Sequence, residues 1–291
     1  MKIGAVFPQT EIGDDPGAIR EYTLALEEMG VDYVLAYDHV IGADPTAYPD
    51  RRFVYTDQDA FHEPFVLFSF MAGITRRLSF VTGILILPQR NAVLVAKQAA
   101  ALDVLSGGRL RLGVGVGWNR AEMEAQGFDF RTRGWRSAEQ VRVMRALWSE
   151  PLVTFEGEFH TIHAMGLNPL PVQRPIPVWF GGGADPVLRR LARYGAGWIP
   201  ASMAPAQAEP IIENIHRYFA EAGRSPTELG IDVRINLNRQ PRAKWESYVT
   251  GWRKLGATHI ALNTMGNQFA SVDEHLAALR DFATFMQNMG S

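Results

Sequence analysis

The sequence predicts an α/β fold, a closed (β/α)8 TIM barrel in which eight strands alternate with eight helices. The first observation is that short apolar, β-branched runs alternate with longer amphipathic runs, which is typical of βα units around a parallel sheet. The second is that eight such units fit into the 291 residues, as a closed barrel requires. An open, doubly wound sheet is the alternative, because a strand count made from sequence can miss a unit.

The strands are expected where the apolar runs are short, at Ile3–Pro8, Tyr33–Asp38, Leu78–Leu87, Arg109–Gly117, Pro177–Gly181, Gly197–Ala201, Ile231–Leu237 and His259–Asn263. The helices are expected between them, at Pro16–Met29, Pro64–Thr75, Ala92–Leu105, Trp135–Ser149, Pro186–Tyr194, Ala206–Ala222, Arg242–Leu255 and Val272–Met289. Asp15-Pro16 and Asp185-Pro186 predict helix starts with an N-cap and a first-turn proline, and Gly30, Gly195 and Gly256 predict helix ends.

Two predicted connections exceed the usual loop of ~2–6 residues. Val40–Glu63 follows the second strand, and Glu150–Arg174 precedes the fifth. Within the second of these, Val153–Ile162 has two alternating runs around a glycine and predicts a β-hairpin. Because neither a repeat nor an interdomain linker interrupts the pattern, we expect one domain over residues 1–291.

The composition excludes several classes of partner. Lys and Arg number 29 against 31 Asp and Glu, so no strong net field favours nucleic acid or an anionic membrane. The chain has no cysteine, which excludes disulfides and thiolate chemistry. No apolar run approaches the ~20 residues of a membrane span, and the first residues resemble a strand more than a signal peptide. We therefore expect a cytoplasmic enzyme with a small-molecule substrate.

In a (β/α)8 barrel, chemistry takes place at the carboxyl ends of the strands. The predicted ends contain no lysine for Schiff-base chemistry and no cluster of metal ligands, so no metal site is predicted. They are instead rich in uncharged hydrogen-bonding groups, aromatic rings and glycines. Such a set suits a large planar cofactor that carries the chemistry itself.

His39, preceded by Asp38 at the end of the second strand, is the candidate catalytic residue. A histidine at this place is suited to act near neutral pH as an acid, a base or a hydrogen-bond donor to a reacting substrate. The alternative is a structural histidine tied to a loop carbonyl.

Two glycine-containing segments are candidate ligand sites. Gly181, Gly182 and Gly183 join the fifth strand to a helix start, where converging N–H groups favour a phosphate; a plain tight turn is the alternative. Gly83, inside the long third strand, indicates a bulge or a close backbone approach to a ligand, or else a packing glycine in a buried strand.

The segment RLRLGVGVGWN (109–119) places glycines at every second position. The spacing differs from the Gly-x-Gly-x-x-Gly of dinucleotide-binding folds, which makes a Rossmann fold unfavourable. Because strand side chains alternate, Gly113, Gly115 and Gly117 share one face with Asn119. We expect this face to leave an empty volume at the barrel mouth, with Asn119 at its rim.

Taken in order, the sequence motifs resemble the bacterial luciferase-like family of flavin and deazaflavin oxidoreductases. They are Tyr37-Asp-His39, Glu63-Pro64, Thr82-Gly-Ile-Leu-Ile-Leu-Pro88, Ala96-Lys-Gln98, Leu105–Asn119, Arg133-Gly134, Phe155–Phe159 and Trp179–Gly183. The resemblance runs through nearly the whole chain and implies a flavin or deazaflavin lying over the strand ends.

The resemblance also implies residue roles. Thr82, Gly83 and Ile84 are expected to form a bulge with a non-proline cis peptide behind the cofactor ring. Asn119 is expected to bond the polar edge of the ring, with Asp38 and Ser202 also at the cofactor and Gly181–Gly183 at its phosphate. His39 is expected on the substrate side.

Within the family the chain is most similar to the group that uses coenzyme F420, a deazaflavin, so we expect hydride transfer to or from a small organic substrate. The sugar-phosphate dehydrogenases of the family have a glutamate proton donor near the fourth strand end, where this chain reads Val116-Gly-Trp118. This difference argues against a sugar-phosphate substrate. The aromatic side chains of Phe7, Tyr37 and Trp118 instead predict an apolar or aromatic substrate.

Three alternatives remain to these expectations. One is an FMN-dependent monooxygenase supplied by a partner reductase, another is a non-catalytic binding protein, and the third is a barrel whose ligand is neither cofactor. A homodimer is expected by the resemblance.

Overall fold

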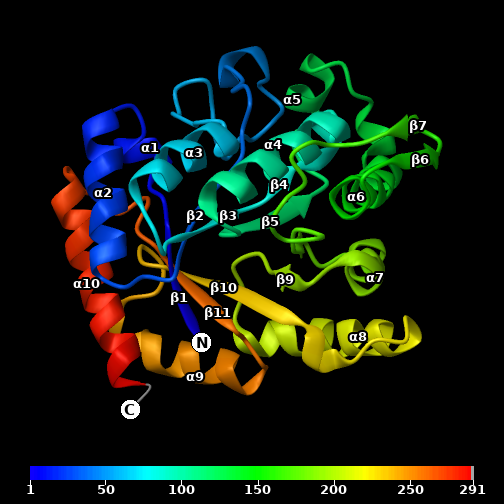
Figure 1. The fold of residues 1–291 in the computed structure, drawn as a ribbon. Helices are drawn as coiled ribbons and strands as arrows, with labels where there is room; N and C mark the ends of the chain where they lie inside the picture. The colour runs from blue at the N-terminus through cyan, green and yellow to red at the C-terminus, as the bar shows by residue number, and fades with distance from the viewer. Residues whose placement is uncertain (290–291) are drawn as a thin grey trace.

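A computed structural model describes residues 1–289, and its strands form a closed parallel barrel (Figure 1). Its eight strand positions are occupied by β1 (Lys2–Val6), β2 (Tyr33–Ala36), β3 (Ser79–Thr82), β5 (Leu110–Gly115), β8 (Val178–Gly181), β9 (Gly197–Ile199), β10 (Gly230–Asn236) and β11 (His259–Asn263). Pairing of β3 with β5 closes the ring. The predicted barrel is confirmed and the open sheet is excluded; residues 290 and 291 of the predicted domain lie outside the described residues.

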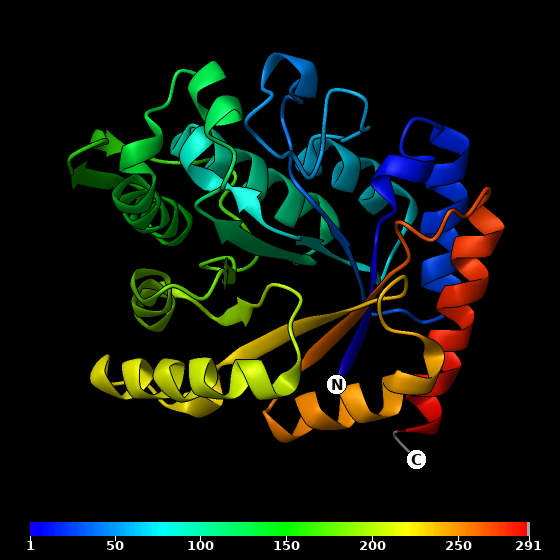
Figure 2. The same cartoon turned by 180° about the vertical axis from the view of Figure 1, so that it is seen from behind.

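The predicted barrel helices surround the strands, as the view from behind also shows (Figure 2). They are α2 (Pro16–Glu28), α3 (Pro64–Ile74), α4 (Ala92–Ser106), α6 (Arg133–Ser149), α7 (Asp185–Tyr194), α8 (Pro205–Glu221), α9 (Trp245–Lys254) and α10 (Val272–Asn288). Asp15 caps α2 by accepting the Gly17 N–H at 2.7 Å, as predicted. Asp185, predicted as an N-cap, is instead the first residue of α7. In residues 1–289 no helix has the length and apolar character needed to cross a membrane.

Shorter elements fill the connections. They are α1 (Gln9–Ile12), α5 (Arg120–Ala125), and single 3-10 turns at Pro45–Ala47, Leu87–Gln89, Phe130–Thr132, Pro226–Glu228 and Arg242–Lys244. The predicted hairpin is confirmed as β6 (Val153–Glu156) paired antiparallel with β7 (Thr161–Met165). Its turn is fixed by Glu139 of α6, whose carboxylate accepts the N–H groups of Glu158 and Phe159 and contacts the His160 ring at 2.8 Å.

The long third strand predicted at Leu78–Leu87 is interrupted after Thr82 and resumes as β4 (Leu85–Ile86). Val81 pairs with Arg111 of β5, whereas Leu85 pairs with Val114. Four residues on one side thus span three on the other, which is a β-bulge. The predicted bulge at Gly83 is confirmed.

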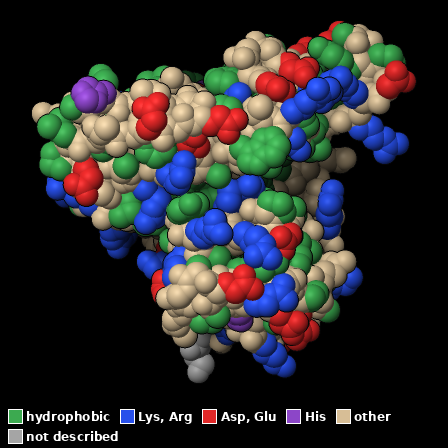
Figure 3. Space-filling view, turned by 90° about the vertical axis from the view of Figure 1, so that its right-hand side faces the viewer, with side chains coloured by type: hydrophobic (Ala, Val, Ile, Leu, Met, Phe, Trp, Pro, Cys, Tyr) green, Lys and Arg blue, Asp and Glu red, His purple; other side chains and the backbone are tan. Residues whose placement is uncertain are grey.

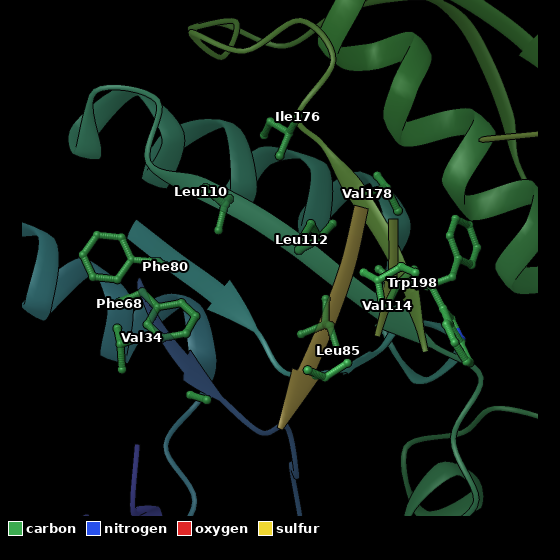
Figure 4. Packing of buried hydrophobic residues seen from close by; sticks show 14 of the residues in the cluster. Val34, Phe68, Phe80, Leu85, Leu110, Leu112, Val114, Ile176, Val178 and Trp198 are labelled. Atoms are coloured by element: carbon green, nitrogen blue, oxygen red, sulfur yellow. The ribbon is translucent and has the colours of Figure 1, made fainter. Parts of the chain in front are cut away.

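Apolar side chains pack on both faces of the barrel wall. Between strands and helices, Figure 4 shows Leu110, Leu112 and Val114 along β5, together with Phe80 and Phe68, whose ring centroids are 5.5 Å apart. Inside the barrel a second cluster contains Val6, Tyr33, Leu35, Val81, Trp179, Ile199 and Ala261. The bulky face of the glycine-rich strand therefore packs on the helices, as expected.

A polar network closes the amino-terminal end of the lumen. Asp232 accepts from Arg111 at 2.6 Å and from the Tyr33 hydroxyl at 2.7 Å. The Arg111 guanidinium stacks 4.2 Å from the Trp179 ring centroid. Because Trp179 also packs against His259, this end of the lumen is filled by side chains. A ligand site inside the barrel is therefore expected at the opposite, carboxyl end.

Candidate active site

His39 lies at the carboxyl end of β2 and is held by Glu122, a residue that the sequence did not single out. Its Nδ1 atom is 3.0 Å from Glu122 Oε2, and the two side chains are 12% and 1% exposed. The other Glu122 oxygen accepts from the Val40 N–H at 2.7 Å and from Gln89 Nε2 at 3.1 Å. The ring is thus tied to a carboxylate and not to the loop carbonyl expected of a structural histidine; the catalytic role of His39 stays a prediction.

The charge state of Glu122 decides the tautomer of His39. Burial alone raises the pKa of this carboxyl, but the hydrogen bonds from His39, Val40 and Gln89 outweigh burial and lower it. An ionised Glu122 accepts only, so Nδ1 of His39 must donate. Among the described residues none bonds Nε2, which leaves that atom as the chemically free nitrogen of the ring.

Aromatic rings surround His39 on its open side. The ring centroids of Tyr55, Phe61 and Trp118 lie 5.0, 4.9 and 6.2 Å from the imidazole. Tyr55 and Phe61 come from the long connection 40–63. A pocket here is lined by His39, Val40, Ile41, Gly42, Tyr55, Thr56, Asp59, Phe61 and Asn119. The long connection is thus a wall of the candidate site.

Asp38 has a different role from His39. Its carboxylate is 2.6 Å from Arg90 Nη2 and accepts the Ile86 N–H at 2.8 Å. Arg90 also reaches Glu63, the N-cap of α3, at 2.8 Å. Asp38 therefore fixes the end of the long connection against the bulge, and its oxygens are engaged by the protein.

The bulge occupies the space that the glycines open. A Cβ on Gly115 would lie 2.4 Å from Ile84 Cγ2, and one on Gly181 would lie 2.1 Å from Ile84 Cδ1. A Cβ on Gly113 would lie 2.2 Å from the Thr82 carbonyl oxygen. The expected empty volume is therefore wrong, because the glycine face accommodates the chain's own bulge.

The peptide bonds of the bulge also differ from the expectation. In residues 1–289 the cis bonds are Asn168-Pro169 and Arg174-Pro175, so the Thr82–Ile84 segment is trans. The segment is fixed by the Thr82 hydroxyl, which donates to the Gly113 carbonyl at 2.7 Å, and by the Gly83 N–H, which donates to the Ala36 carbonyl at 2.6 Å. Ile84 remains partly buried at the mouth of the lumen.

Asn119 is the N-cap of α5. Its amide contacts Glu122 at 3.4 Å (N–H of Glu122 to Oδ1) and 3.5 Å (Nδ2 to Oε2). Because both contacts are long, the amide retains donor and acceptor capacity toward the pocket that it lines. The side chain thus lies beside the His39 and Glu122 pair.

The phosphate candidates lie at the start of α7. Gly182 has φ of 98°, a backbone conformation that favours glycine, and Gly183 is exposed. No side chain caps α7 at Ala184, but Pro186 has no N–H and the Val187 N–H donates to the Ala184 carbonyl at 2.8 Å, so in the first turn only the Asp185 N–H is left for a phosphate. Ser202, after β9, accepts from Asn236 at 2.9 Å, and Asn236 accepts from Asn263 at 2.9 Å. This amide chain follows the ends of three neighbouring strands.

The structure places the three predicted substrate-pocket residues in different surroundings. Trp118 is 47% exposed beside His39, as a pocket wall requires. Tyr37 packs at the top of the lumen cluster, with its backbone held by both ends of the buried Gln9 amide. Phe7 is fully buried and packs on Tyr22 of α2 at 5.7 Å. The prediction for Phe7 is therefore wrong, because its side chain points to the helix layer.

Sequence reasoning missed Glu122 and Arg234, although signals for both existed. Asn119 and Glu122 have the three-residue spacing of a helix capping pair. In Ile231–Asn236, Asp232, Arg234 and Asn236 alternate with apolar residues, so one face of a barrel strand is polar. Gln9 had no comparable signal.

The open end fits a large planar cofactor with a phosphate. A buried guanidinium nitrogen, Nη1 of Arg234, has no hydrogen-bond partner among the described residues. The backbone at Gly182 and Gly183 is open, with nothing nearer than 3.6 Å to an added Cβ. The described residues contain no group of three or more potential metal ligands. The guanidinium and the open glycine backbone therefore suit a planar ring with carbonyl edges and a phosphate.

Comparison with known proteins relates the chain to one family. A family model described as Luciferase-like monooxygenase matches residues 1–284. An uncharacterised protein of Mycobacterium tuberculosis is 34% identical over 226 residues, which are 74% of this chain and 78% of that protein. An F420-dependent glucose-6-phosphate dehydrogenase of Intrasporangium calvum is 28% identical over 271 residues, which are 89% of this chain and 76% of that enzyme.

Solved structures show the same architecture. An F420-dependent secondary alcohol dehydrogenase in complex with an F420-acetone adduct superposes with a TM-score of 0.77 at 18% identity, covering 96% of this chain and 97% of that chain. The monooxygenase RslO1 from Streptomyces bottropensis has a TM-score of 0.77 at 20% identity and covers 100% of both chains. At these identities the likeness concerns the fold.

Proposed function

Because the chain belongs to the luciferase-like monooxygenase family, we propose that it is an oxidoreductase that uses coenzyme F420 to transfer hydride to or from a small neutral substrate. The F420-dependent relatives of Intrasporangium calvum and Kineococcus radiotolerans support this cofactor. The observation that carries the proposal is the buried Glu122 carboxylate, which binds Nδ1 of His39 and leaves Nε2 without a partner among the described residues, in a ring that lines an aromatic-walled pocket.

The proton chemistry belongs to His39. In the oxidative direction, Nε2 takes the hydroxyl proton of an alcohol as hydride leaves the neighbouring carbon; in the reductive direction it returns the proton to the oxygen. The Glu122 carboxylate fixes the ring orientation and favours the imidazolium that forms. Phe61, Tyr55 and Trp118 exclude water from the reacting oxygen.

The side chains around His39 also indicate which class of substrate the pocket binds. Rings dominate the surroundings of His39, and the nearby guanidinium of Arg90 is already paired with Asp38 and Glu63. The residues that line this pocket include no Lys or Arg to bind the phosphate of a phosphorylated substrate. We therefore favour an apolar or aromatic alcohol, or the corresponding carbonyl compound.

A bound deazaflavin would supply or accept the hydride. In this proposal Gly181, Gly182 and Gly183, with the uncapped start of α7, hold its phosphate. Asn119 and Ser202 bond the ring edge, while Thr82, Gly83 and Ile84 back one face. Catalysis then rests mainly on holding the two reacting carbons face to face.

Substitution of His39 tests the catalytic role. His39→Ala, with His62→Ala as a control outside the pair, is mixed with reduced F420 and a panel of neutral ketones under anaerobic conditions. We expect hydride transfer by the wild type and a loss of ~10²–10⁴ in rate for His39→Ala at unchanged F420 affinity. Unchanged turnover in His39→Ala would support a non-catalytic binding protein, and turnover that needs O2 and FMN would support the monooxygenase supplied by a partner reductase.

We further propose that the chain forms a homodimer through α3 and α4. Their outer faces expose Val66, Phe70, Leu94 and Leu105 at 65, 43, 56 and 73%. The charged residues of α3 and α4 are Lys97, whose ammonium donates to the Asn168 carbonyl, and the buried Asp103, which accepts from Gln173. By contrast, Figure 3 shows Lys and Arg gathered among acidic side chains on the side of α6, α7 and α8.

A mostly apolar face matches an identical face related by a twofold axis, and a single Lys in α3 and α4 is little basic charge for binding an anionic membrane. Sedimentation of Phe70→Glu and Leu105→Glu variants tests the interface. We expect monomers for these variants and a dimer for the wild type. A wild-type monomer would contradict this arrangement.

A further inference from the structure

Arg234 lies in the barrel lumen, between the sealed end and the candidate site. Alternate residues of β10 share a face, so Arg234 projects on the same side as Asp232 and Asn236. Asp232 binds Tyr33 of β2 and Arg111 of β5, which lie elsewhere around the barrel, so this face is the interior. Arg234 is therefore one step below the strand ends.

The guanidinium of Arg234 has no carboxylate partner. It donates to the Pro200 carbonyl at the end of β9, and its Nη1 atom is buried without any partner among residues 1–289. Arg111 also has a buried Nη1 without a partner, but Arg111 pairs with Asp232 at 2.6 Å and Arg90 pairs with Asp38 and Glu63, whereas Arg234 has no carboxylate partner among residues 1–289. A buried charge without an anion is costly, and a ligand that supplies one would offset that cost.

Two tyrosines, Tyr37 and Tyr55, are close enough to Arg234 to respond to its charge. Burial raises the pKa of Tyr37 and that of Tyr55, the latter to about 12, and the charge of Arg234 counteracts both shifts. Tyr55 is also the ring 5.0 Å from His39. Tyr55 thus lies near both His39 and Arg234.

We propose that Arg234 binds the carbonyl edge of the redox ring and stabilises the negative charge that the ring gains with hydride. The inference rests on the proposed function. In the oxidative direction the substrate alcohol becomes a carbonyl compound, its hydride brings two electrons and one proton to the ring, and its hydroxyl proton goes to His39. The charge left on the ring is then paired by Arg234, which adjusts the electronics of the cofactor.

The test compares Arg234→Gln and Arg234→Lys with Arg239→Gln, a control at an exposed arginine near the same strand end. Titrations with oxidised and with reduced F420, followed by absorbance and fluorescence, give the two dissociation constants for each protein. We expect Arg234→Gln to weaken the reduced form at least tenfold more than the oxidised form, equivalent to a fall of about 30 mV in the bound reduction potential. Arg234→Lys should recover part of the difference, and Arg239→Gln should match the wild type.

Thermal unfolding of the ligand-free proteins separates this role from a structural one. Because Arg234 is partly buried without a carboxylate partner and its Nη1 atom is unsatisfied, Arg234→Gln should unfold at or above the wild-type temperature. Equal loss of both redox forms, no loss of either, or a lowered unfolding temperature would overturn the inference while leaving the proposed function intact. Failure of the wild type to bind F420 would overturn both.

Discussion

At the scale of single residues, the site depends on a buried carboxylate that acts through a histidine. Glu122 receives bonds from His39, Val40 and Gln89, so three donors converge on one side chain from separate segments. Its lowered pKa keeps it ionised near neutral pH, which commits Nδ1 of His39 to donating. Glu122 is accordingly a positioning residue, whereas His39 meets the substrate.

Glu122→Gln should remove the charge but keep most of the shape. The Val40 and Gln89 donors hold the amide oxygen, so the amide NH2 faces Nδ1 of His39 and favours the other tautomer. We therefore expect kcat to fall about 10- to 100-fold, part of the ~10²–10⁴ that acid–base catalysis supplies. The 15N shifts of neutral His39 should change from the tautomer with the proton on Nδ1 toward the one with the proton on Nε2.

Glu124→Gln provides the matched control, because Glu124 lies on the same helix, is 53% exposed and contacts Arg120. It should leave both kcat and the His39 spectrum unchanged. A Glu122→Gln protein with the wild-type tautomer and rate would disprove the positioning role.

At the scale of elements, the bulge between β3 and β4 and the glycines of β5 and β8 form one packing unit. Ile84 occupies the space left by Gly115 and Gly181, and the Thr82 carbonyl approaches Gly113. The bulge is therefore built into the barrel wall, and its exposed edge is available to back a ligand.

Substitutions at these glycines should be coupled to Ile84. Gly115→Ala and Gly181→Ala should each destabilise the protein by ~1–3 kcal/mol through overpacking, and adding Ile84→Ala should recover much of that loss. Gly113→Ala should not be recovered, because its obstacle is a backbone oxygen. Urea unfolding measures the coupling, with Gly134→Ala as a control whose Cβ meets only Arg190 Nη1 at 3.8 Å. Simple additivity at positions 115 and 181 would contradict the packing unit.

Sequence periodicity was sufficient for the barrel elements and for the hairpin, because both depend on local alternation of apolar residues. It also placed His39, Trp118 and Asn119 at the open end. It failed for Phe7, since alternation alone does not say which face of a strand lies inward. It also failed for the role of the glycine face, the tie between Asp38 and Arg90, and the partner of His39, because those contacts join residues far apart in the chain.

At the scale of the whole molecule, the two ends of the barrel have different roles. The amino-terminal end is sealed by Arg111, Asp232, Tyr33 and Trp179, whereas the carboxyl end carries the pocket and the unpaired Arg234. This division matches the general separation of stability and chemistry in (β/α)8 barrels.

The stability of the protein should depend on pH through His259, which lies at the sealed end of the barrel. Burial, with Arg111 as the next cause, lowers its pKa to about 4, below the ordinary 6.5. As pH falls, His259 of the unfolded chain is protonated near pH 6.5, whereas His259 of the folded protein is protonated only near pH 4. The free energy of unfolding therefore decreases as pH falls from about 6.5 to about 4. His259→Asn should show a smaller decline in urea midpoint over this window than the wild type, and an identical decline in both would contradict the assignment.

The central claim is that the open end binds a deazaflavin, and the most direct measurement is a titration of the purified protein with F420 and, separately, with FMN. We predict saturable quenching by F420 at one molecule per chain, with much weaker binding of FMN. Tight binding of FMN with none of F420 would contradict the proposed cofactor, and binding of neither would contradict the claim itself.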